Sequence, residues 1–210
     1  MSKITFKYCA LQYLNQWLDR DSTYCETLSN EAASEEDKLE CLAKSAAFYK
    51  IARNLPEKFD KQQYIPRYKP LLSIIESQKQ SSFSGASLVN AILSVEREIS
   101  KQYGNRKLLS LTTKVLWLKF RSPIIIYDSR ARATLRVKGS DLGEYYKQWN
   151  LEYRKHEDEI AKACDSLKDV WEYTSNIKVA NSTYVMQTAE QQWFKERVFD
   201  IYLWSRGNEE

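Results

Sequence analysis

The sequence predicts an all-α fold of two helical lobes with a central cleft, and two observations carry this prediction. Glycine occurs 5 times and proline 4 times in 210 residues, too rarely for a turn-rich β sandwich or barrel. Apolar residues instead recur at steps of three and four along most of the chain, which is the spacing of one face of a helix. Hydrophobic residues make up 43% and charged residues 29%, as in folded globular chains. We therefore expect a single helical domain over 1–210, with a candidate lobe boundary near 78–86.

The first helices follow from local signals. Apolar residues between Tyr8 and Leu18 predict an amphipathic helix, and the polar stretch 19–34 that follows predicts a loop. Ser34 and Asp37 have the spacing of a capping box, in which a side chain satisfies free backbone N–H groups. A long helix is expected to begin there and to end before Pro56.

The middle of the chain alternates short helices and turns. A basic turn between Pro66 and Pro70 precedes a short helix over 71–75. The serine-rich segment 78–85 predicts a loop or hinge. A fourth helix is expected over 88–99, where apolar residues recur at helical spacing, and Gly104 ends it.

The second half predicts more helices around one extended run. After the apolar segment 108–120 and Pro123, the β-branched run 124–127 favours extended backbone. A helix is expected to begin near Ser129, and Arg197 and Asp200 can pair at i,i+3 on the last helix. The remaining expected helices are 141–155, 158–173 and 189–204.

Composition also excludes several classes of protein. The four cysteines lie far apart without a Cys-x-x-Cys pair, and the single histidine is His156, so neither a metal site nor a cofactor is expected. Free thiols are typical of a reducing cytoplasm. The sequence has no long apolar run, so no membrane span is expected, and the protein is expected to be a cytoplasmic monomer. The net charge of +4 permits a polyanionic partner.

One helix carries more information than the others. The segment 108–120 places large apolar side chains on nearly every side of a helix, which indicates a buried, central helix. Lys114 lies in its middle. A lysine there must extend to solvent, pair with an anion or line a cavity. Burial would also lower its pKa, and a neutral amine is a nucleophile.

Asp128 stands at the end of the run 124–127, directly before Ser129. Its carboxylate can cap the next helix, or it can face the same cavity as Lys114. A helix rise of about 9 Å from Lys114 to Phe120 can be retraced by five extended residues that span about 16 Å. Two interpretations remain open: a helix cap with a separately extended lysine, or a Lys114–Asp128 pair at one site.

The stretch from Leu108 to about Arg136 resembles the helix-hairpin-helix DNA glycosylases, most of all the 8-oxoguanine type. The matching features are Lys114 in an apolar helix, then a proline, a short hydrophobic run and Asp128. The resemblance implies that the lysine attacks C1′ of the target nucleotide and forms a Schiff base. It implies that the aspartate stabilises positive charge on the sugar. The family usually has a Gly-x-Gly signature before the lysine, whereas this chain has Leu109-Ser110-Leu111.

The resemblance adds double-stranded DNA as the expected partner and assigns further residues. Basic side chains near turns and after Asp128 are candidate phosphate contacts, although a solvated basic face explains them equally well. These residues are Arg67, Lys69, Arg106, Lys107, Arg130, Arg132 and Arg136. Trp117 and Tyr127 are candidates for a base pocket, because aromatic rings usually sandwich an extruded base; the alternative is that they are core.

Two functions are therefore predicted as alternatives. The first is a DNA N-glycosylase, with or without AP-lyase activity, that uses Lys114 and Asp128 in repair or in antiphage defence. The second is a non-catalytic helical module that binds DNA or protein. The target base stays open among oxidised purines, alkylated bases and hypermodified phage bases.

Overall fold

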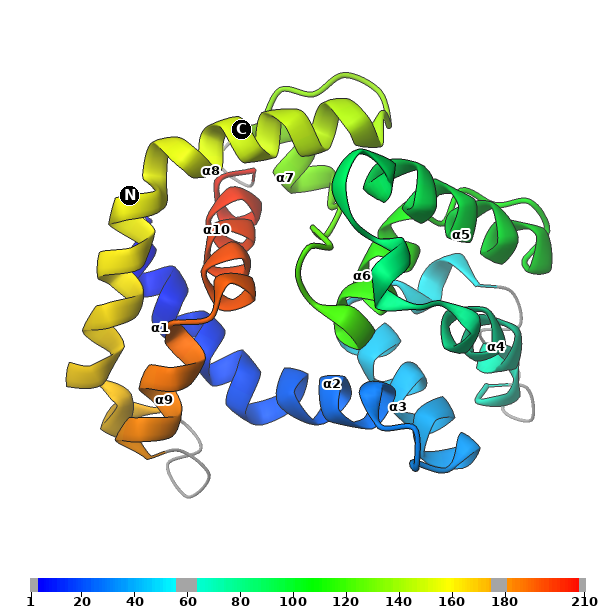
Figure 1. Ribbon diagram of the computed structural model, residues 1–210, viewed down its shortest axis with the longest axis horizontal. Coiled ribbons are helices and arrows are strands. Elements are labelled where there is room, and N and C mark those ends of the chain that lie inside the picture. The colour runs from blue at the N-terminus through cyan, green and yellow to red at the C-terminus, as the bar shows by residue number, and fades with distance from the viewer. Residues whose placement is uncertain (1–3, 56–63, 175–180, 208–210) are drawn as a thin grey trace. The chain divides into compact units, whose positions relative to one another are not determined.

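The computed structural model describes residues 4–55, 64–174 and 181–207, and within these ranges the fold is all-α (Figure 1). This confirms the predicted fold class. Strands are absent from the described ranges, and the run 124–127 is irregular but buried. The α-helices are α1 (Phe6–Gln16), α2 (Ser22–Ser29), α3 (Glu35–Phe48), α4 (Lys69–Ser77), α5 (Leu88–Gln102), α6 (Leu109–Phe120), α7 (Ser129–Thr134), α8 (Leu142–Asp165), α9 (Ser182–Ala189) and α10 (Gln192–Arg206).

The chain forms two compact units that interleave in sequence. Unit 1 comprises Met1–Ser22 and Tyr127–Glu210, and unit 2 comprises Thr23–Ile126. The segment 78–86, the candidate lobe boundary, lies inside unit 2. The chain passes between the units instead at 22–23 and at 126–127.

Unit 1 is built around α10, which packs against α1, α7 and α8. Figure 1 shows α10 between α1 and α8. Aromatic side chains fill this core: the rings of Tyr13 and Phe194 lie 4.9 Å apart, and those of Trp149 and Phe199 lie 5.0 Å apart. Burying several large rings contributes more apolar area per residue than aliphatic packing does.

Unit 2 packs α3 on α4, α4 on α5 and α5 on α6. The predicted cap of α3 is confirmed, because Ser34 Oγ accepts the Asp37 N–H at 3.1 Å. The predicted end of α5 is confirmed as well. Gly104 and Asn105 have φ angles of 73° and 56°, a left-handed conformation that a helix cannot continue through.

Two sequence expectations about helices are wrong, and a third helix is shorter than expected. The stretch 19–34 is largely helical: a π-helical segment, Trp17–Asp21, leads into α2. The long helix α3 ends at Phe48, and Pro56 lies outside the described residues. The expected helices 141–155 and 158–173 are mainly one helix, α8, which continues to Asp165. Short 3₁₀ turns over 166–169 and 171–173 follow it.

Candidate functional site

Lys114 lies in unit 2 on α6, the most apolar of the described helices. All residues from 111 to 118 are buried, so this helix has no solvent-facing side over two turns. The side chain of Lys114 is part of this buried set, with 6% of the residue exposed. Its Nζ donates a hydrogen bond to Ser110 Oγ at 2.9 Å, one turn earlier. The expectation of a buried lysine in a central helix is therefore confirmed.

The neighbouring hydroxyl groups on α6 are occupied by the helix itself. Thr112 Oγ1 donates to the Leu108 carbonyl and Thr113 Oγ1 donates to the Leu109 carbonyl, each at 3.1 Å. Such bonds to the preceding turn give the hydroxyl hydrogen of a threonine inside a helix an acceptor. Within the buried stretch 111–118, Lys114 is therefore the residue whose side chain carries a basic nitrogen.

Asp128 lies in unit 1 and is the N-cap of α7, as predicted. Its Oδ1 accepts the backbone N–H of Arg130 at 2.9 Å, and its carbonyl accepts the N–H of Arg132 at 2.9 Å. The carboxylate is half-buried and carries its charge at the helix N-terminus, where backbone N–H groups favour a negative charge. The capping hydrogen bond helps to fix the orientation of this carboxylate.

Tyr145 of α8 supports the backbone at Asp128. Its phenol is fully buried and forms a hydrogen bond with the backbone of Asp128. Burial raises the pKa of Tyr145 well above its ordinary value, with the charge of Asp200 as the next cause. The phenol is therefore neutral at neutral pH. The Tyr127 ring packs edge-on against it, with ring centres 5.0 Å apart.

Lys114 and Asp128 belong to different units, on either side of the junction 126–127. The structure describes each unit by itself. The expected Lys114–Asp128 pair and the central cleft therefore stay predictions, whereas the local environment of each residue is known.

The predicted phosphate contacts in unit 1 follow Asp128 along and beyond α7. Arg130 and Arg136 are exposed, and Arg132 is half-buried. The guanidinium of Arg130 lies over the Trp204 ring, 4.6 Å from its centre. Arg132 donates to the Gly139 carbonyl. Arg130 and Arg136 can therefore reach a phosphate directly, whereas Arg132 also holds the loop after α7.

In unit 2, three of the four predicted basic residues are exposed and one is not. Arg106 and Lys107 lie in the turn between α5 and α6, and Lys69 pairs with Glu35 at 3.1 Å. Arg67 is only 5% exposed, so the expectation that it is a surface contact is corrected.

The reason for the burial of Arg67 is its packing on aromatic rings. Its guanidinium lies 5.0 Å from the ring centres of both Tyr64 and Tyr68, and it donates to the Tyr68 hydroxyl at 3.0 Å. Cation–π contacts and a hydrogen bond compensate for the desolvation of the guanidinium. Arg67 is thus a structural residue of unit 2.

The two candidate base-pocket residues are core residues of their units. Trp117 is 1% exposed on α6, and Tyr127 is 8% exposed against Tyr145. In the structure both rings are packed as core side chains, which is the alternative that the sequence analysis gave for them. A contact of either ring with an extruded base stays a prediction.

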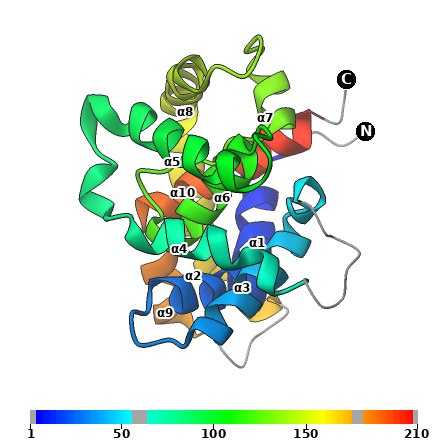
Figure 2. The ribbon, with the colours of Figure 1, turned by 90° about the vertical axis from the view of Figure 1, so that its right-hand side faces the viewer.

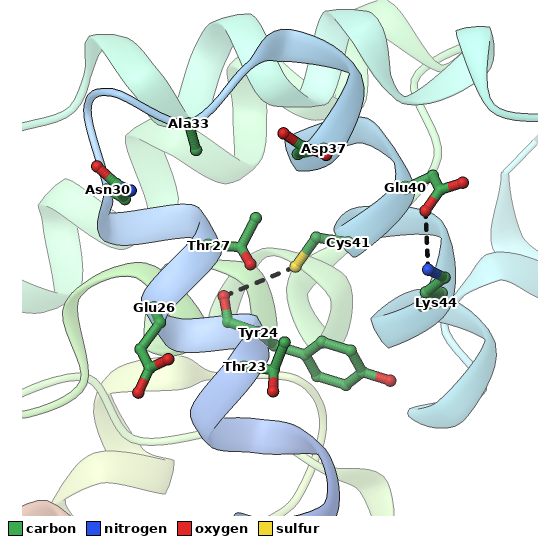
Figure 3. Close-up of a pocket in the computed structure, with 10 residues that line it drawn as sticks. All are labelled: Thr23, Tyr24, Glu26, Thr27, Asn30, Ala33, Asp37, Glu40, Cys41 and Lys44. Atoms are coloured by element: carbon green, nitrogen blue, oxygen red, sulfur yellow. Dashed lines mark hydrogen bonds and ion pairs between the residues drawn. The ribbon is translucent and has the colours of Figure 1, made fainter.

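A polar pocket of about 420 Å³ lies between α2 and α3 in unit 2 (Figure 3). The thiol of Cys41 donates to the Tyr24 carbonyl at 3.6 Å, and burial raises its pKa to about 12. Lys44 pairs with Glu40 at 2.8 Å. The thiol is too weakly acidic for nucleophilic work at neutral pH. The lining residues are Thr23, Tyr24, Glu26, Thr27, Asn30, Ala33, Asp37, Glu40, Cys41 and Lys44.

A buried polar network in unit 1 was only partly foreseen. The predicted Arg197–Asp200 pair is confirmed at 3.0 Å, with both side chains less than a tenth exposed. Trp149 Nε1 also donates to Asp200 Oδ1 at 2.8 Å. Burial raises the pKa of Asp200 to about 6, although Arg197 and Trp149 act to lower it. The sequence signal was the i,i+3 spacing, which does not show burial.

No three histidine, cysteine, aspartate or glutamate side chains in the described ranges gather closely enough to hold a metal ion. Helices long and apolar enough to cross a membrane are likewise absent from those ranges.

Comparison with known proteins gives no match. No protein-family model, no curated protein and no solved structure matches this chain. The resemblance to the helix-hairpin-helix glycosylases therefore depends on the residues from Leu108 to Arg136 alone.

Proposed function

We propose that this chain is a DNA N-glycosylase that removes a damaged or modified base, with Lys114 as the nucleophile and Asp128 as its electrostatic partner. The observation that carries the proposal is the burial of Lys114 in the middle of an apolar helix. Placing a lysine there costs desolvation energy that a surface position would avoid. A primary amine in such surroundings is the group that Schiff-base chemistry uses.

The chemistry assigned to Lys114 is a substitution at C1′ of the target nucleotide. The amine nitrogen forms a bond to C1′, the N-glycosidic bond breaks, and its electron pair leaves with the base, which takes up a proton. Loss of a proton from nitrogen and opening of the sugar ring give a Schiff base. A β-elimination from this intermediate would cleave the strand and provide the AP-lyase activity.

The role assigned to Asp128 is to stabilise positive charge on the sugar as the base departs. Two features support it: the carboxylate is half-buried, and the Arg130 N–H holds one of its oxygens at 2.9 Å. A carboxylate fixed before the reaction needs no reorganisation when the charge develops. The hydrogen bond between the Asp128 backbone and the Tyr145 hydroxyl adds to this fixation.

Duplex DNA is the proposed substrate because exposed basic residues flank both candidate groups. Arg106 and Lys107 lie in the turn that precedes α6, and Arg130 and Arg136 follow Asp128. The turn also contains left-handed backbone at Gly104, where a main chain can come close to a phosphate. Phosphate contacts of this kind position a protein on DNA without reading its sequence. We propose a monomer in the reducing cytoplasm, which the free cysteines fit.

Borohydride trapping tests the proposal. Duplexes that carry an oxidised purine, an alkylated base or a hypermodified phage base are incubated with the protein, and base release and covalent adducts are measured. Wild type is expected to release one of these bases and to form an adduct. Lys114→Gln, which keeps side-chain length without a charge to bury, is expected to fold and to form none.

Lys119 on the same helix provides a matched control. It is half-buried, and burial lowers its pKa, so it is the competing amine of α6. Lys119→Gln is expected to retain trapping. Trapping that survives Lys114→Gln and is lost in Lys119→Gln would move the nucleophile to Lys119. Absence of base release on all duplexes would favour the non-catalytic binding module.

A further inference from the structure

Trp204 differs from the other tryptophans of the described ranges in its exposure. It lies on α10 and is 41% exposed, whereas Trp17, Trp117 and Trp149 are at most 5% exposed. Trp171 and Trp193 are half-buried. A large aromatic ring that stays in water loses the stabilisation that burial would provide. Such a ring, next to the buried run Arg197–Leu203 of α10, points to a binding role.

Close packing of α7 on the last turn of α10 fixes the position of Trp204. Figure 2 shows these two helices side by side. Thr134 Oγ1 donates to the Leu203 carbonyl at 2.8 Å. A Cβ atom on Gly207 would lie 2.7 Å from the Arg130 carbonyl oxygen, so only glycine allows this approach. The surface is thus preformed.

One arginine lies over the ring, and three further exposed cations lie two residues beyond Trp204 on α10 or after α7. The Arg130 guanidinium covers one part of it at 4.6 Å, and Arg206 donates to the Tyr202 hydroxyl at 3.1 Å. Arg136 and Lys138 are exposed after α7. None of the four cations has a carboxylate within 4.0 Å in the described ranges. Their exposure gives this surface the positive charge that an anionic partner would need.

We propose that the surface formed by Trp204, Arg130 and Arg206 binds a DNA strand, with the indole stacked on a nucleobase and the two arginines on adjacent phosphates. The choice of DNA as the polyanion rests on the proposed function. An indole has a π face for any base, and stacking combined with cationic side chains is how proteins hold exposed bases without reading sequence. Because Asp128 caps the same helix α7, this surface would hold the strand next to Asp128.

The binding assay uses unmodified single strands, so that no base release is required. Fluorescence anisotropy compares a labelled oligothymidylate with a strand of equal length built from tetrahydrofuran abasic analogues, which have no C1′ aldehyde to react with an amine. Trp204→Leu is expected to weaken binding of the oligothymidylate by about 5- to 150-fold and to leave the abasic strand nearly unchanged. Trp204→Phe is expected to restore much of the affinity.

The arginines and the controls give separate readouts. The double variant Arg130→Gln/Arg206→Gln is expected to bind both strands more weakly. The slope of log affinity against log salt concentration is expected to decrease by the equivalent of about two phosphate contacts. Arg154→Gln, an exposed arginine on α8, and Tyr173→Leu, an 80% exposed ring, are expected to change little. Each variant is checked for a wild-type melting curve.

Two results would overturn the inference. The first is an unchanged affinity of Trp204→Leu for the oligothymidylate. The second is that polyglutamate binds as tightly as the oligothymidylate and depends equally on Trp204, which would indicate an acidic protein partner. Failure of the glycosylase proposal is distinguishable from this. Trp204-dependent DNA binding without base release or trapping would keep the surface and reject the enzyme.

Discussion

Replacing Asp200 with asparagine is expected to change how the stability of the protein depends on pH. Asp200 is 7% exposed and accepts hydrogen bonds from Trp149 and Arg197. Its pKa is nevertheless raised from 3.8 to about 6, with burial as the largest cause. The carboxyl group therefore holds its proton to a higher pH in the folded protein than in the unfolded chain.

The sign and the size of the effect follow from this difference. Between pH values of about 4 and 6 the folded state binds more protons at Asp200 than the unfolded state does, so stability falls as the pH rises. Well below a pH of about 4 both states are protonated, and well above a pH of about 6 both are ionised, so the contribution is constant at those extremes. Each pKa unit corresponds to about 1.4 kcal/mol. The free energy of unfolding therefore falls by about 3 kcal/mol across this window because of Asp200.

Urea unfolding of the wild type and of Asp200→Asn at several pH values between about 3.5 and 7.5 measures this contribution. Subtracting the two curves cancels the other titrating groups. The variant also leaves Arg197 buried without its carboxylate, but arginine does not titrate here, so this loss is a constant offset. The wild type is expected to lose about 3 kcal/mol relative to the variant as the pH rises. A relative gain would refute the reasoning, because it would mean that Arg197 stabilises the carboxylate more than burial destabilises it.

Three further predictions concern stability and reactivity. Gly207→Ala is expected to lower stability by about 1–3 kcal/mol, because its Cβ would clash with the Arg130 backbone; an unchanged melting temperature would contradict this packing. Ser34→Ala is expected to lose about 1 kcal/mol in urea unfolding through loss of the α3 cap, and no loss would mean that the cap is not needed. Burial raises the pKa of three thiols to about 12, so they should react with a disulfide reagent at neutral pH only after unfolding, and fast reaction of the folded protein would argue against this burial. These thiols are Cys9, Cys41 and Cys164.

Helix starts were predictable because capping chemistry is local. Ser34 accepts the N–H of Asp37, Asp128 accepts that of Arg130, and Asp141 accepts that of Glu144. In each case the cap and the group it satisfies lie within three residues, so the sequence contains the whole interaction. Burial of Lys114 was predictable for a related reason, since its own helix has no polar face.

Helix interiors that look polar were not predictable in the same way. The charged stretch around His156 suggested a break between two helices, but α8 continues through it. Lysine and glutamate are good helix formers, and Lys155 pairs with Glu152 at i,i+3. The ring of His156 is held 5.3 Å from that of Phe6, a contact distant in sequence. In 19–34, a narrow face with Cys25 and Leu28 was enough for α2.

The environment of site residues depends on partners far along the chain. Arg67 is buried partly because the Tyr103 hydroxyl donates to its carbonyl at 2.6 Å, which no local pattern indicates. Trp204 belongs to a helix of regular apolar spacing, and only the packing of α7 shows that its ring is exposed beside Arg130. The spacing of Lys114 and Asp128 identified them as candidates, but spacing does not determine how two separate units are placed.

Peptide mapping of the borohydride-reduced adduct tests the central claim most directly. A duplex that supports base release is incubated with the wild-type protein and reduced, and the adduct is digested and sequenced by mass spectrometry. The account predicts that the nucleotide remnant is attached to Nζ of Lys114. Attachment to Lys119, to another lysine or to the terminal amine would contradict it, as would base release without any adduct under conditions in which a known lyase is trapped.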